Sequence, residues 1–333
     1  MTLRVLWPRR DPSRDNSAEL EGLGENLEAV FGGGMDNVSD EQWAACDGIV
    51  GTQPSPEDMT KLQNCKIFVK TAVGYDDVDV AAWTKRNIPV CNCPDYGTRE
   101  VADHTIALML AIFRGITYHD QLLHSHPDLN WHMTAIPFAR RLSSMTLGLI
   151  GFGRIAVATA LRAKAFEMDV TFFDANKPNG IEHSLGIRRS DSLDELLGES
   201  DVVSVHTPLN ERTKRMFNAE LFKGMKRGSV LINTARGPIV DLNALYDAMK
   251  SDTVMAAGLD VLPEEPMNVE SPLIKAWLQG EDWIKHRLVI TPHTAFMTPE
   301  SLYDIRRLTA RTAARYLRDG VLENCVNRRE LRI

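Results

Sequence analysis

The fold of this chain is decided by the stretch T-L-G-L-I-G-F-G-R-I-A at residues 146–156. Its apolar first half predicts a strand, after which Gly151, Gly153 and Ala156 follow at the spacing G-x-G-x-x-G/A. Gly151 allows a tight turn, Gly153 lets a phosphate approach the backbone, and Ala156 lets the following helix pack on the sheet. Asp174 ends the next predicted strand. This context predicts a dinucleotide site at a helix N-terminus, and the alternative is a plain glycine turn with a solvated aspartate.

A carboxylate at the end of the second strand bears on which dinucleotide binds. Asp174 is placed to accept hydrogen bonds from the adenosine ribose hydroxyls and to repel a 2′-phosphate, which favours NAD over NADP. Lys177 follows three residues later and leaves NADP open. The cofactor-binding residues predicted in this part of the chain are Ile150, Gly151, Phe152, Gly153, Arg154, Ile155 and Asp174.

Short apolar runs alternate with helical patterns on both sides of this stretch. From it onward we predict strands at 147–150, 170–173, 201–206, 229–233, 254–259 and 288–291. Before it we predict strands at 3–7, 48–52, 66–70 and 89–90, with helices around 18–31 and 56–62, and a long helix at 299–318 closes the chain. Such alternation predicts parallel sheets wrapped by helices, so the expected fold class is α/β with two doubly wound parallel-sheet lobes.

Length and charge exclude several classes of protein. With 333 residues the chain is long enough for two domains. It carries 38 basic and 45 acidic residues, a formal net charge of −7, which gives no electrostatic footprint for nucleic acid. Its longest purely apolar run, residues 106–113, is shorter than the roughly 20 residues that span a bilayer. We therefore expect neither a nucleic-acid partner nor a membrane partner.

The amino terminus and the cysteines bear on location. Residues 1–10 lack the apolar run and small-residue cleavage site of a signal peptide. The five cysteines are scattered without C-x-x-C pairs, as in a reducing compartment. Cys91 and Cys93 are interpreted as packing residues rather than as a redox or metal pair. We expect a cytoplasmic protein without a metal site.

One predicted helix, at 98–119, is unusual because its middle is apolar on every face. The sequence there is T-I-A-L-M-L-A-I-F, at residues 105–113. A helix of this kind must be buried on all sides. We expect a second subunit to supply part of the cover, and therefore a homodimer that forms through the cofactor domain.

Polar residues follow two later strands, where a cofactor lies in sheets of this kind. Thr207 and Pro208 follow one strand, and N-T-A-R-G at residues 233–237 follows the next. Arg236 suits bidentate capture of a carboxylate, and its alternative is a surface salt bridge. The cofactor-binding residues predicted here are Thr207, Pro208, Thr234 and Ala235.

A histidine follows the last predicted strand, in T-P-H-T-A-F at residues 291–296. Transfer of a hydride from an alcohol needs a base for the hydroxyl proton, and imidazole titrates nearest neutrality. His293 is the candidate base, unless it is only a structural polar residue. A neighbouring carboxylate would orient the ring. The stretch G-L-D-V-L-P-E-E-P, at residues 258–266, offers Glu264 and Glu265, and either one fits.

These motifs resemble those of the D-isomer-specific 2-hydroxyacid dehydrogenase family over essentially the whole chain. The glycine turn, N-T-A-R-G-P-I-V-D, G-L-D-V-L-P-E-E-P and T-P-H-T-A-F stand in the family's order and spacing. The chain is most similar to the C-terminal-binding protein branch, through R-A-K-A-F, P-N-G-I-E-H-S-L-G-I and E-N-C-V-N. The resemblance implies a Rossmann NAD-binding domain at 99–293 and a flavodoxin-like substrate-binding domain at 1–98 and 294–333.

The resemblance also implies catalytic roles. Arg236, Glu265 and His293 are implied to form the catalytic trio. Glu265 takes the acid role rather than Glu264, because the family's acid directly precedes a proline, five residues after Asp260. Asp260 is implied to hold the nicotinamide carboxamide, and with His293 it completes the predicted cofactor-binding residues.

Substrate-binding residues are implied as well. The stretch V-K-T-A-V-G-Y-D-D-V-D at 69–79 resembles the family's substrate loop, so its amides should meet the substrate carboxylate. Lys70 falls where the most similar branch carries arginine, and Phe296 replaces that branch's tryptophan. Phe296 leaves more room than tryptophan at the pocket wall. The predicted substrate-binding residues are Lys70, Val73, Gly74, Arg236 and Phe296.

The function implied is hydride transfer between NAD(H) and a D-2-hydroxy acid or its 2-keto acid. Small to medium acids such as glyoxylate, pyruvate or hydroxypyruvate are expected. The alternative is an NAD(H)-sensing dimeric binding module resembling C-terminal-binding co-repressors, which retain the trio. A formate-dehydrogenase-like activity is disfavoured, because that relative would carry glutamine in place of Glu265.

Overall fold

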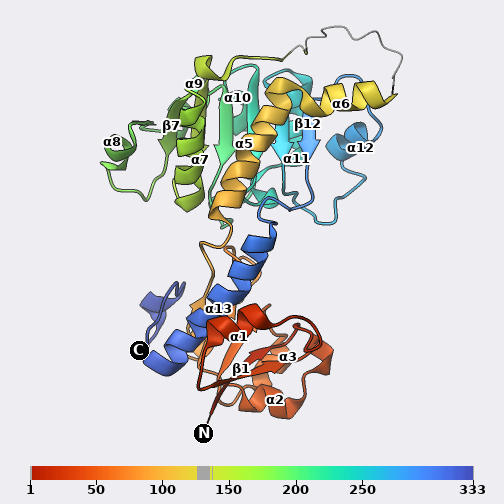
Figure 1. Cartoon of the computed structure of the whole chain (residues 1–333). Coiled ribbons are helices and arrows are strands. Elements are labelled where there is room, and N and C mark those ends of the chain that lie inside the picture. The colour runs from red at the N-terminus through yellow and green to blue at the C-terminus, as the bar shows by residue number, and fades with distance from the viewer. Residues whose placement is uncertain (1, 126–135, 137, 333) are drawn as a thin grey trace. The chain divides into compact units, whose positions relative to one another are not determined.

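The computed structural model describes residues 2–125, 136 and 138–332. The chain divides into two compact units, a smaller unit of Met1–Gly97 with Met297–Ile333 and a larger unit of Thr98–Phe296 (Figure 1). The boundaries predicted from the sequence, after residues 98 and 293, lie one and three residues away from these. Among the described residues, every helix is too short or too polar to cross a bilayer.

The smaller unit is built on a parallel sheet with the strand order β2-β1-β3-β4-β5. This is the flavodoxin-like order, in which helices cover both faces. The strands are β1 (Leu3–Trp7), β2 (Leu27–Phe31), β3 (Gly48–Gly51), β4 (Ile67–Lys70) and β5 (Val90–Cys91). One face packs against α2 (Asp40–Ala45), α3 (Pro56–Lys61) and α4 (Val80–Lys85), and the other against α1 (Ser17–Leu23) and α13 (Pro299–Asp319). Single 3₁₀ turns lie at Met35–Asn37 and Arg328–Glu330.

The stretch 18–31, predicted as one helix, is a helix followed by a strand. α1 ends at Leu23, and the amide of the following Gly24 bonds to the Leu20 carbonyl. Beyond it β2 pairs in parallel with β1, and Leu27 and Ala29 pack toward α1 and α13. The prediction was wrong because a short apolar run fits the helical and the strand period equally well.

The larger unit carries a parallel sheet with the strand order β12-β11-β10-β9-β6-β7-β8. The strands are β6 (Thr146–Ile150), β7 (Asp169–Phe173), β8 (Arg188–Arg189), β9 (Val202–Val205), β10 (Ser229–Asn233), β11 (Val254–Leu259) and β12 (Leu288–Ile290). The helices are α5 (Thr98–Arg114), α6 (Ile116–Ser125), α7 (Arg154–Ala165), α8 (Ile181–Leu185), α9 (Leu193–Glu199), α10 (Ala219–Lys223), α11 (Leu242–Lys250) and α12 (Pro272–Leu278), with 3₁₀ turns at Leu142–Ser144 and Gly237–Ile239.

Both faces of this sheet are buried, as a doubly wound sheet requires. In β10, Val230 and Ile232 pack into a cluster with α5 and α7, whereas Leu231 packs with α9 to α12. Figure 1 shows α5 and α7 lying side by side on their face. The predicted fold class, α/β with two doubly wound parallel sheets, is confirmed. The sequence prediction missed β8, because two residues are too few to show a period.

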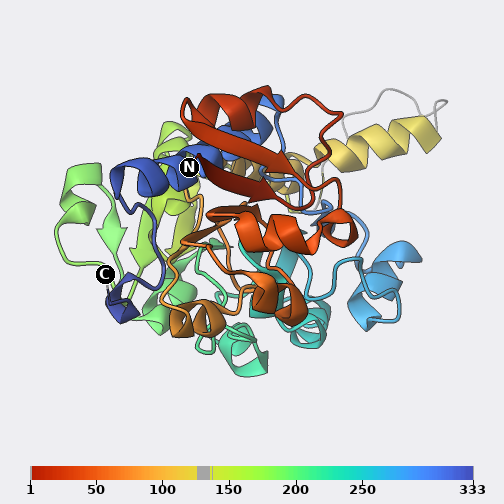
Figure 2. The same ribbon diagram turned by 90° about the horizontal axis from the view of Figure 1, so that it is seen from below.

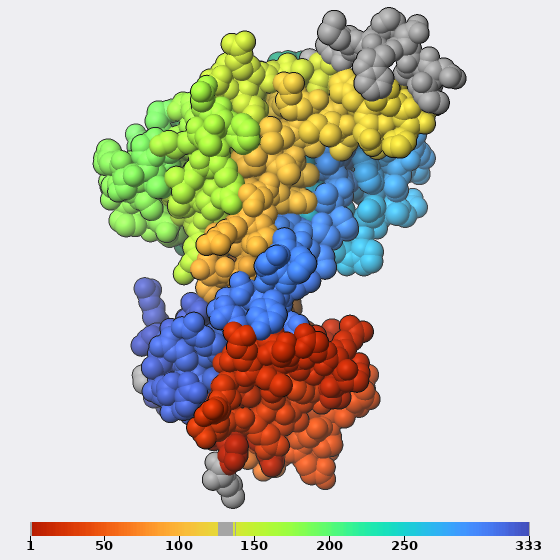
Figure 3. Space-filling model, viewed as in Figure 1, coloured from red at the N-terminus to blue at the C-terminus, as the bar shows by residue number. Residues whose placement is uncertain are grey.

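The apolar stretch 106–113 of α5 is covered mostly within one chain. The residues of this stretch that are buried in the core of the larger unit are Ile106, Leu108, Met109, Ile112 and Phe113. Leu110 and Ala111 are half-buried and Ala107 is exposed, so packing inside the larger unit covers most of the stretch but not every face. α6 comes next and has no buried residue. Figure 2 shows α6, in yellow, projecting beyond the rest of its unit, and Figure 3 shows it, again in yellow, at one end of that unit.

Candidate functional site

The strand order of the larger unit reverses between β6 and β9, and a turn with a strict steric requirement lies there. Gly151 follows β6 with φ +84°, a conformation that favours glycine. A Cβ atom at Gly151 would lie 2.9 Å from the His206 carbonyl oxygen and 2.9 Å from Thr207 Cγ2. The protein's own packing therefore requires the first glycine of the motif.

The second glycine of the motif, Gly153, is not required by any contact of this kind. Gly153 has φ −83°, and a Cβ atom there would meet nothing within 4 Å. It precedes α7, whose first turn has no side-chain cap. In the described part of the chain, Thr207 Oγ1 is buried without a hydrogen-bond partner. Open space, uncapped amides and an unpaired hydroxyl together fit the pyrophosphate end of a dinucleotide.

Asp174 closes this turn from the end of β7. Its two carboxylate oxygens accept hydrogen bonds of 2.8 Å from the amides of Phe152 and Asn176. Arg189, which the sequence prediction missed, donates to the carbonyl oxygens of Asp174 at 3.1 Å and Lys177 at 2.8 Å. The loop is therefore fixed from both sides, and the carboxylate keeps lone pairs for ribose hydroxyls. Arg189 belongs to no recognised motif, and the two-residue strand β8 that carries it is too short to be predicted from the sequence.

The remaining residues predicted for the cofactor lie at the end of β6, at the start of α7 and after β9. Ile150 is buried at the end of β6, and Ile155 is half-buried in the first turn of α7. Arg154 and Pro208 are exposed. The structure therefore brings the predicted residues after β6, β7 and β9 to one edge of the sheet.

Asn233 shapes the loop that presents Arg236 after β10. Its Oδ1 accepts the Ala235 amide at 3.0 Å, and its Nδ2 donates to the Arg236 carbonyl at 2.9 Å. Arg236 is half-buried, and its Nη1 donates to the Ala235 carbonyl at 2.8 Å. Thr234 is buried, and its hydroxyl lies 2.9 Å from Thr105 Oγ1 on α5.

Gly237 brings this loop against the loop that follows β11. A Cβ atom at Gly237 would lie 1.9 Å from the Leu262 carbonyl carbon and 2.5 Å from the Pro263 nitrogen. A side chain is excluded there, so the two loops touch through their backbones. One loop carries Arg236 and the other carries Glu265.

The structure distinguishes between the two adjacent glutamates. Glu265 Oε2 lies 2.8 Å from His293 Nδ1, and Glu265 Oε1 accepts the Leu262 amide at 3.0 Å. Glu264 instead accepts a hydrogen bond from Asn268 at 3.1 Å. The side chains of Glu265 and His293 are each 42% exposed, so the pair is reachable from outside the unit. The geometry therefore joins Glu265, not Glu264, to the candidate base.

Asp260 holds the turn that carries the candidate base. It is 2% exposed, and its Oδ1 accepts from Thr291 Oγ1 at 2.6 Å and from the Thr294 amide at 2.9 Å. Its Oδ2 accepts the Ala295 amide at 3.0 Å. Within this turn His293 adopts φ +54°, and its amide bonds to the Asp260 carbonyl. The sequence prediction gave Asp260 to the nicotinamide carboxamide and missed this role in the turn.

Two further side chains lie close to this turn. The Phe296 ring is half-buried and meets the His293 ring edge-on, with 6.2 Å between centroids and 86° between planes. His104 of α5 lies with its Nε2 2.9 Å from Thr291 Oγ1. Sequence reasoning missed His104, because it lies 187 residues from its partner.

The substrate residues predicted in the smaller unit follow β4. Lys70 is 9% exposed and forms an ion pair with Asp77. The Val73 carbonyl accepts from Asn92 Nδ2 at 2.7 Å. The amides of Val73 and Gly74 donate to no other described group. The charge of Lys70 is therefore compensated by Asp77, while the N–H groups of Val73 and Gly74 remain available to donate to a ligand.

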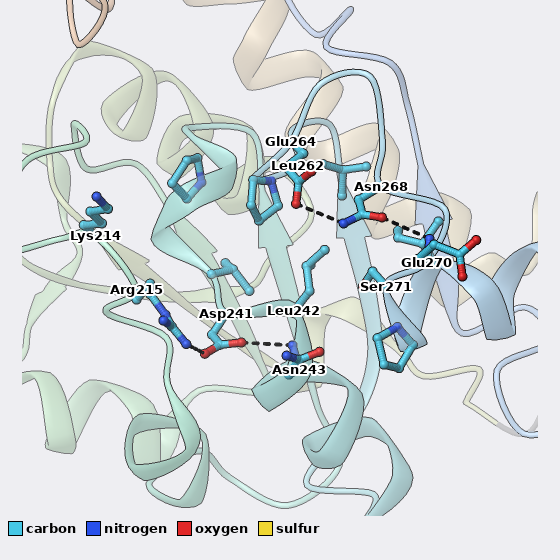
Figure 4. A pocket seen from close by; sticks show the side chains of 15 residues that line it. Lys214, Arg215, Asp241, Leu242, Asn243, Leu262, Glu264, Asn268, Glu270 and Ser271 are labelled. Atoms are coloured by element: carbon cyan, nitrogen blue, oxygen red, sulfur yellow. Dashed lines mark hydrogen bonds and ion pairs between the residues drawn. The ribbon is translucent and has the colours of Figure 1, made fainter.

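A hollow of about 500 Å³ borders the loops that carry Arg236 and Glu265 (Figure 4). Its wall includes Pro238 and residues 262–264, but none of the trio lines it. In Figure 4 the Arg215–Asp241 ion pair lies on one side and Glu264, bonded to Asn268, on the other. This hollow is therefore separate from the candidate base.

Comparisons with known proteins support the family expected from the sequence, but two of the relatives that they name are glyoxylate reductases, and the predicted similarity to the C-terminal-binding protein branch is not supported. Residues 106–295 match the family model described as "D-isomer specific 2-hydroxyacid dehydrogenase, NAD binding domain". The chain is 34% identical to a glyoxylate reductase of Korarchaeum cryptofilum (strain OPF8), over 100% of this chain and 98% of that protein.

Two solved structures are similar over nearly the whole chain. One is a D-lactate dehydrogenase from Aquifex aeolicus in complex with NAD and lactic acid, with 30% identity, a TM-score of 0.76 and coverage of 95% of this chain and 96% of that one. The other is an NADPH-dependent glyoxylate/hydroxypyruvate reductase from Sinorhizobium meliloti in complex with NADP and malonate, with 27% identity, a TM-score of 0.82 and coverage of 100% and 99%.

Proposed function

The chain belongs to the D-isomer-specific 2-hydroxyacid dehydrogenase family of NAD(P)-dependent oxidoreductases, and we propose that it interconverts glyoxylate or a similarly small 2-keto acid with its 2-hydroxy acid. The observation that carries this proposal is the 2.8 Å contact between His293 Nδ1 and Glu265 Oε2. It provides an imidazole oriented by a carboxylate, on a turn that Asp260 holds in place. This is the arrangement that proton transfer to a carbonyl oxygen needs.

The roles of the trio follow from donor and acceptor chemistry. An ionised Glu265 only accepts, so His293 Nδ1 carries the proton of their hydrogen bond. The Nε2 atom of His293 is then the nitrogen that exchanges a proton with the substrate oxygen. Arg236 binds the substrate carboxylate and polarises the keto oxygen. The bound nicotinamide dinucleotide supplies or accepts the hydride.

We infer that the preferred dinucleotide is NAD. Asp174 stands at the end of β7 with both oxygens already oriented by the amides of Phe152 and Asn176. A carboxylate fixed in this way attracts ribose hydroxyls and repels a 2′-phosphate. Lys177 is held near the same loop by Arg189 and is the group that opposes this preference.

The substrate is proposed to be small because the ring of Phe296 limits the space beside the proposed base, His293. The Phe296 ring meets the His293 ring edge-on, so it bounds the space next to that imidazole. The Korarchaeum relative is named a glyoxylate reductase, which agrees with a small keto acid. Of the substrates predicted from the sequence, glyoxylate is proposed first, and pyruvate and hydroxypyruvate are the next in size.

Reduction of a panel of 2-keto acids by NADH tests the proposal. We expect turnover of glyoxylate, and losses in kcat/KM of about 10²- to 10⁴-fold in His293→Ala and Arg236→Ala. NADH binding, followed by fluorescence, is expected to survive both changes, because they act on the substrate and the proton. Exposed Lys223→Ala on α10 is the matched control.

The panel also separates the enzyme from a nucleotide-sensing binding module of the C-terminal-binding protein kind. A module binds NADH without turning over any acid of the panel, and that outcome would overturn the proposed function. Homodimerisation and a cytoplasmic location stay predictions.

A further inference from the structure

We propose that His104 of α5 is a positioning residue for His293, acting through Thr291 and Asp260. The inference rests on the proposed function, since it assigns His293 the proton transfer. Its basis is a chain of contacts inside the larger unit. His104 Nε2 lies 2.9 Å from Thr291 Oγ1, and that hydroxyl lies 2.6 Å from Asp260 Oδ1.

The direction of each hydrogen bond in this chain is fixed by chemistry. The Thr291 hydroxyl has one proton, and an ionised Asp260 can only accept. Thr291 therefore donates to Asp260 and must accept from His104. It follows that His104 carries a proton on Nε2, in the neutral tautomer or as imidazolium.

The chain ends on the backbone of the candidate base. The carboxylate of Asp260 also accepts the amides of Thr294 and Ala295, which directly follow His293. His293 has φ +54°, a conformation that non-glycine residues adopt rarely and that the surrounding contacts must impose. When His104 is lost, the Thr291 hydroxyl is free to turn toward another acceptor, and Asp260 loses one of the donors that orient it.

The neighbouring residue on α5 holds a second strand end in the same way. Thr105 Oγ1 donates to the Val101 carbonyl at 2.8 Å, so Thr234 is the donor in the 2.9 Å contact between Thr105 and Thr234. Thr234 lies two residues before Arg236. His104 and Thr105, which are consecutive on α5, therefore contact the two strand ends that lead to the proposed base, His293, and to the proposed carboxylate-binding residue, Arg236.

Steady-state kinetics on the full chain test the proposal with two variants at one position. His104→Leu removes the donor, and we expect kcat for glyoxylate to fall about tenfold with the KM for NADH unchanged within about twofold. His104→Gln keeps an N–H group, and we expect it to restore most of kcat. His183→Leu on α8, at a side chain that is 86% exposed, is the matched control.

A double-mutant cycle separates positioning from a merely structural role. If His104 acts through His293, adding His104→Leu to His293→Ala causes no further loss of activity. Losses that multiply, or a His104→Gln variant as impaired as His104→Leu, would overturn the proposal.

A spectroscopic test does not depend on turnover. In protein labelled with ¹⁵N-histidine, the His104 signals, assigned by their absence in His104→Gln, should show a proton on Nε2. An unprotonated Nε2 overturns the inference even if the enzyme reduces keto acids. A protonated Nε2 in a protein that reduces none supports the contact and rejects the proposed function, so the two failures are distinguishable.

Discussion

Glu264 and Glu265 are neighbours in sequence, but Glu265 contacts the imidazole of His293 whereas Glu264 bonds to Asn268. We expect Glu265→Gln to lower kcat/KM about tenfold or more, because the ring loses the charge that orients and stabilises its protonated form. Glu264→Gln is the matched control and should stay within about twofold of wild type. Steady-state kinetics with NADH and glyoxylate measure both, and equal losses would contradict the assignment.

Asp174 is the residue on which the cofactor preference depends. In Asp174→Ala the repulsion of a 2′-phosphate is gone, so the ratio of kcat/KM for NADPH to that for NADH should rise about tenfold or more. Asp282→Ala, at a side chain that is 99% exposed, should leave the ratio unchanged. A wild-type protein that uses NADPH as well as NADH would show that Lys177 overrides Asp174.

Functional residues could be predicted from the sequence where they belong to a motif. The side chains that they contact could not be predicted, because the fold decides those contacts. The residues alone left Glu264 and Glu265 open, because only the fold decides which carboxylate turns toward His293. Lys70 stays a predicted substrate residue, and its ion pair with Asp77 is a contact that the sequence did not predict. His104 carries no motif, since its partner Thr291 is brought near only by the packing of α5 on the sheet.

At the scale of elements, a histidine that directly follows β9 makes stability depend on pH. Burial lowers the pKa of His206 to about 4, below its ordinary value of about 6.5. Between these values the unfolded chain binds the proton and the folded chain does not, so stability is full above pH 6.5 and falls as the pH drops toward 4. From pH 7.5 to pH 5 this one group should cost about 2 kcal/mol of unfolding free energy.

Denaturant unfolding at the two pH values measures this cost. In His206→Gln the loss between pH 7.5 and pH 5 should be smaller than in wild type by about that amount, because glutamine does not titrate. His183→Gln, at a side chain that is 86% exposed, is the control and should follow wild type. If wild type and His206→Gln lose equal unfolding free energy between pH 7.5 and pH 5, the pH dependence comes from groups other than His206.

Elements were predictable where the apolar pattern was long and flanked by turn residues. The strand at 229–233 and the one at 254–259 have the predicted bounds, because buried parallel strands read as continuous apolar runs. The stretch 18–31 was misread because its apolar residues fit the helical and the strand period equally well, and β8 was missed because two residues are too few to show a period. At the scale of the molecule, the larger unit begins with α5 at Thr98 and ends at Phe296, one residue after the turn whose amides Asp260 accepts.

Assembly is the remaining property of the whole molecule. The sequence predicted a dimer contact at α5, whereas the exposed apolar residues of the structure favour a contact at α6. The stretch 106–113 is mostly covered within one chain, whereas α6 leaves Ile116 58% and Leu123 40% exposed with no buried residue. An apolar helix face in water is stabilised by a partner, and a second copy of this chain is the one we expect. Light scattering should therefore give a dimer at micromolar concentration, and Ile116→Glu with Leu123→Glu should shift it to monomer. Leu278→Glu, at an equally exposed leucine on α12, should stay dimeric. A wild-type monomer would show that a single chain tolerates this exposed face.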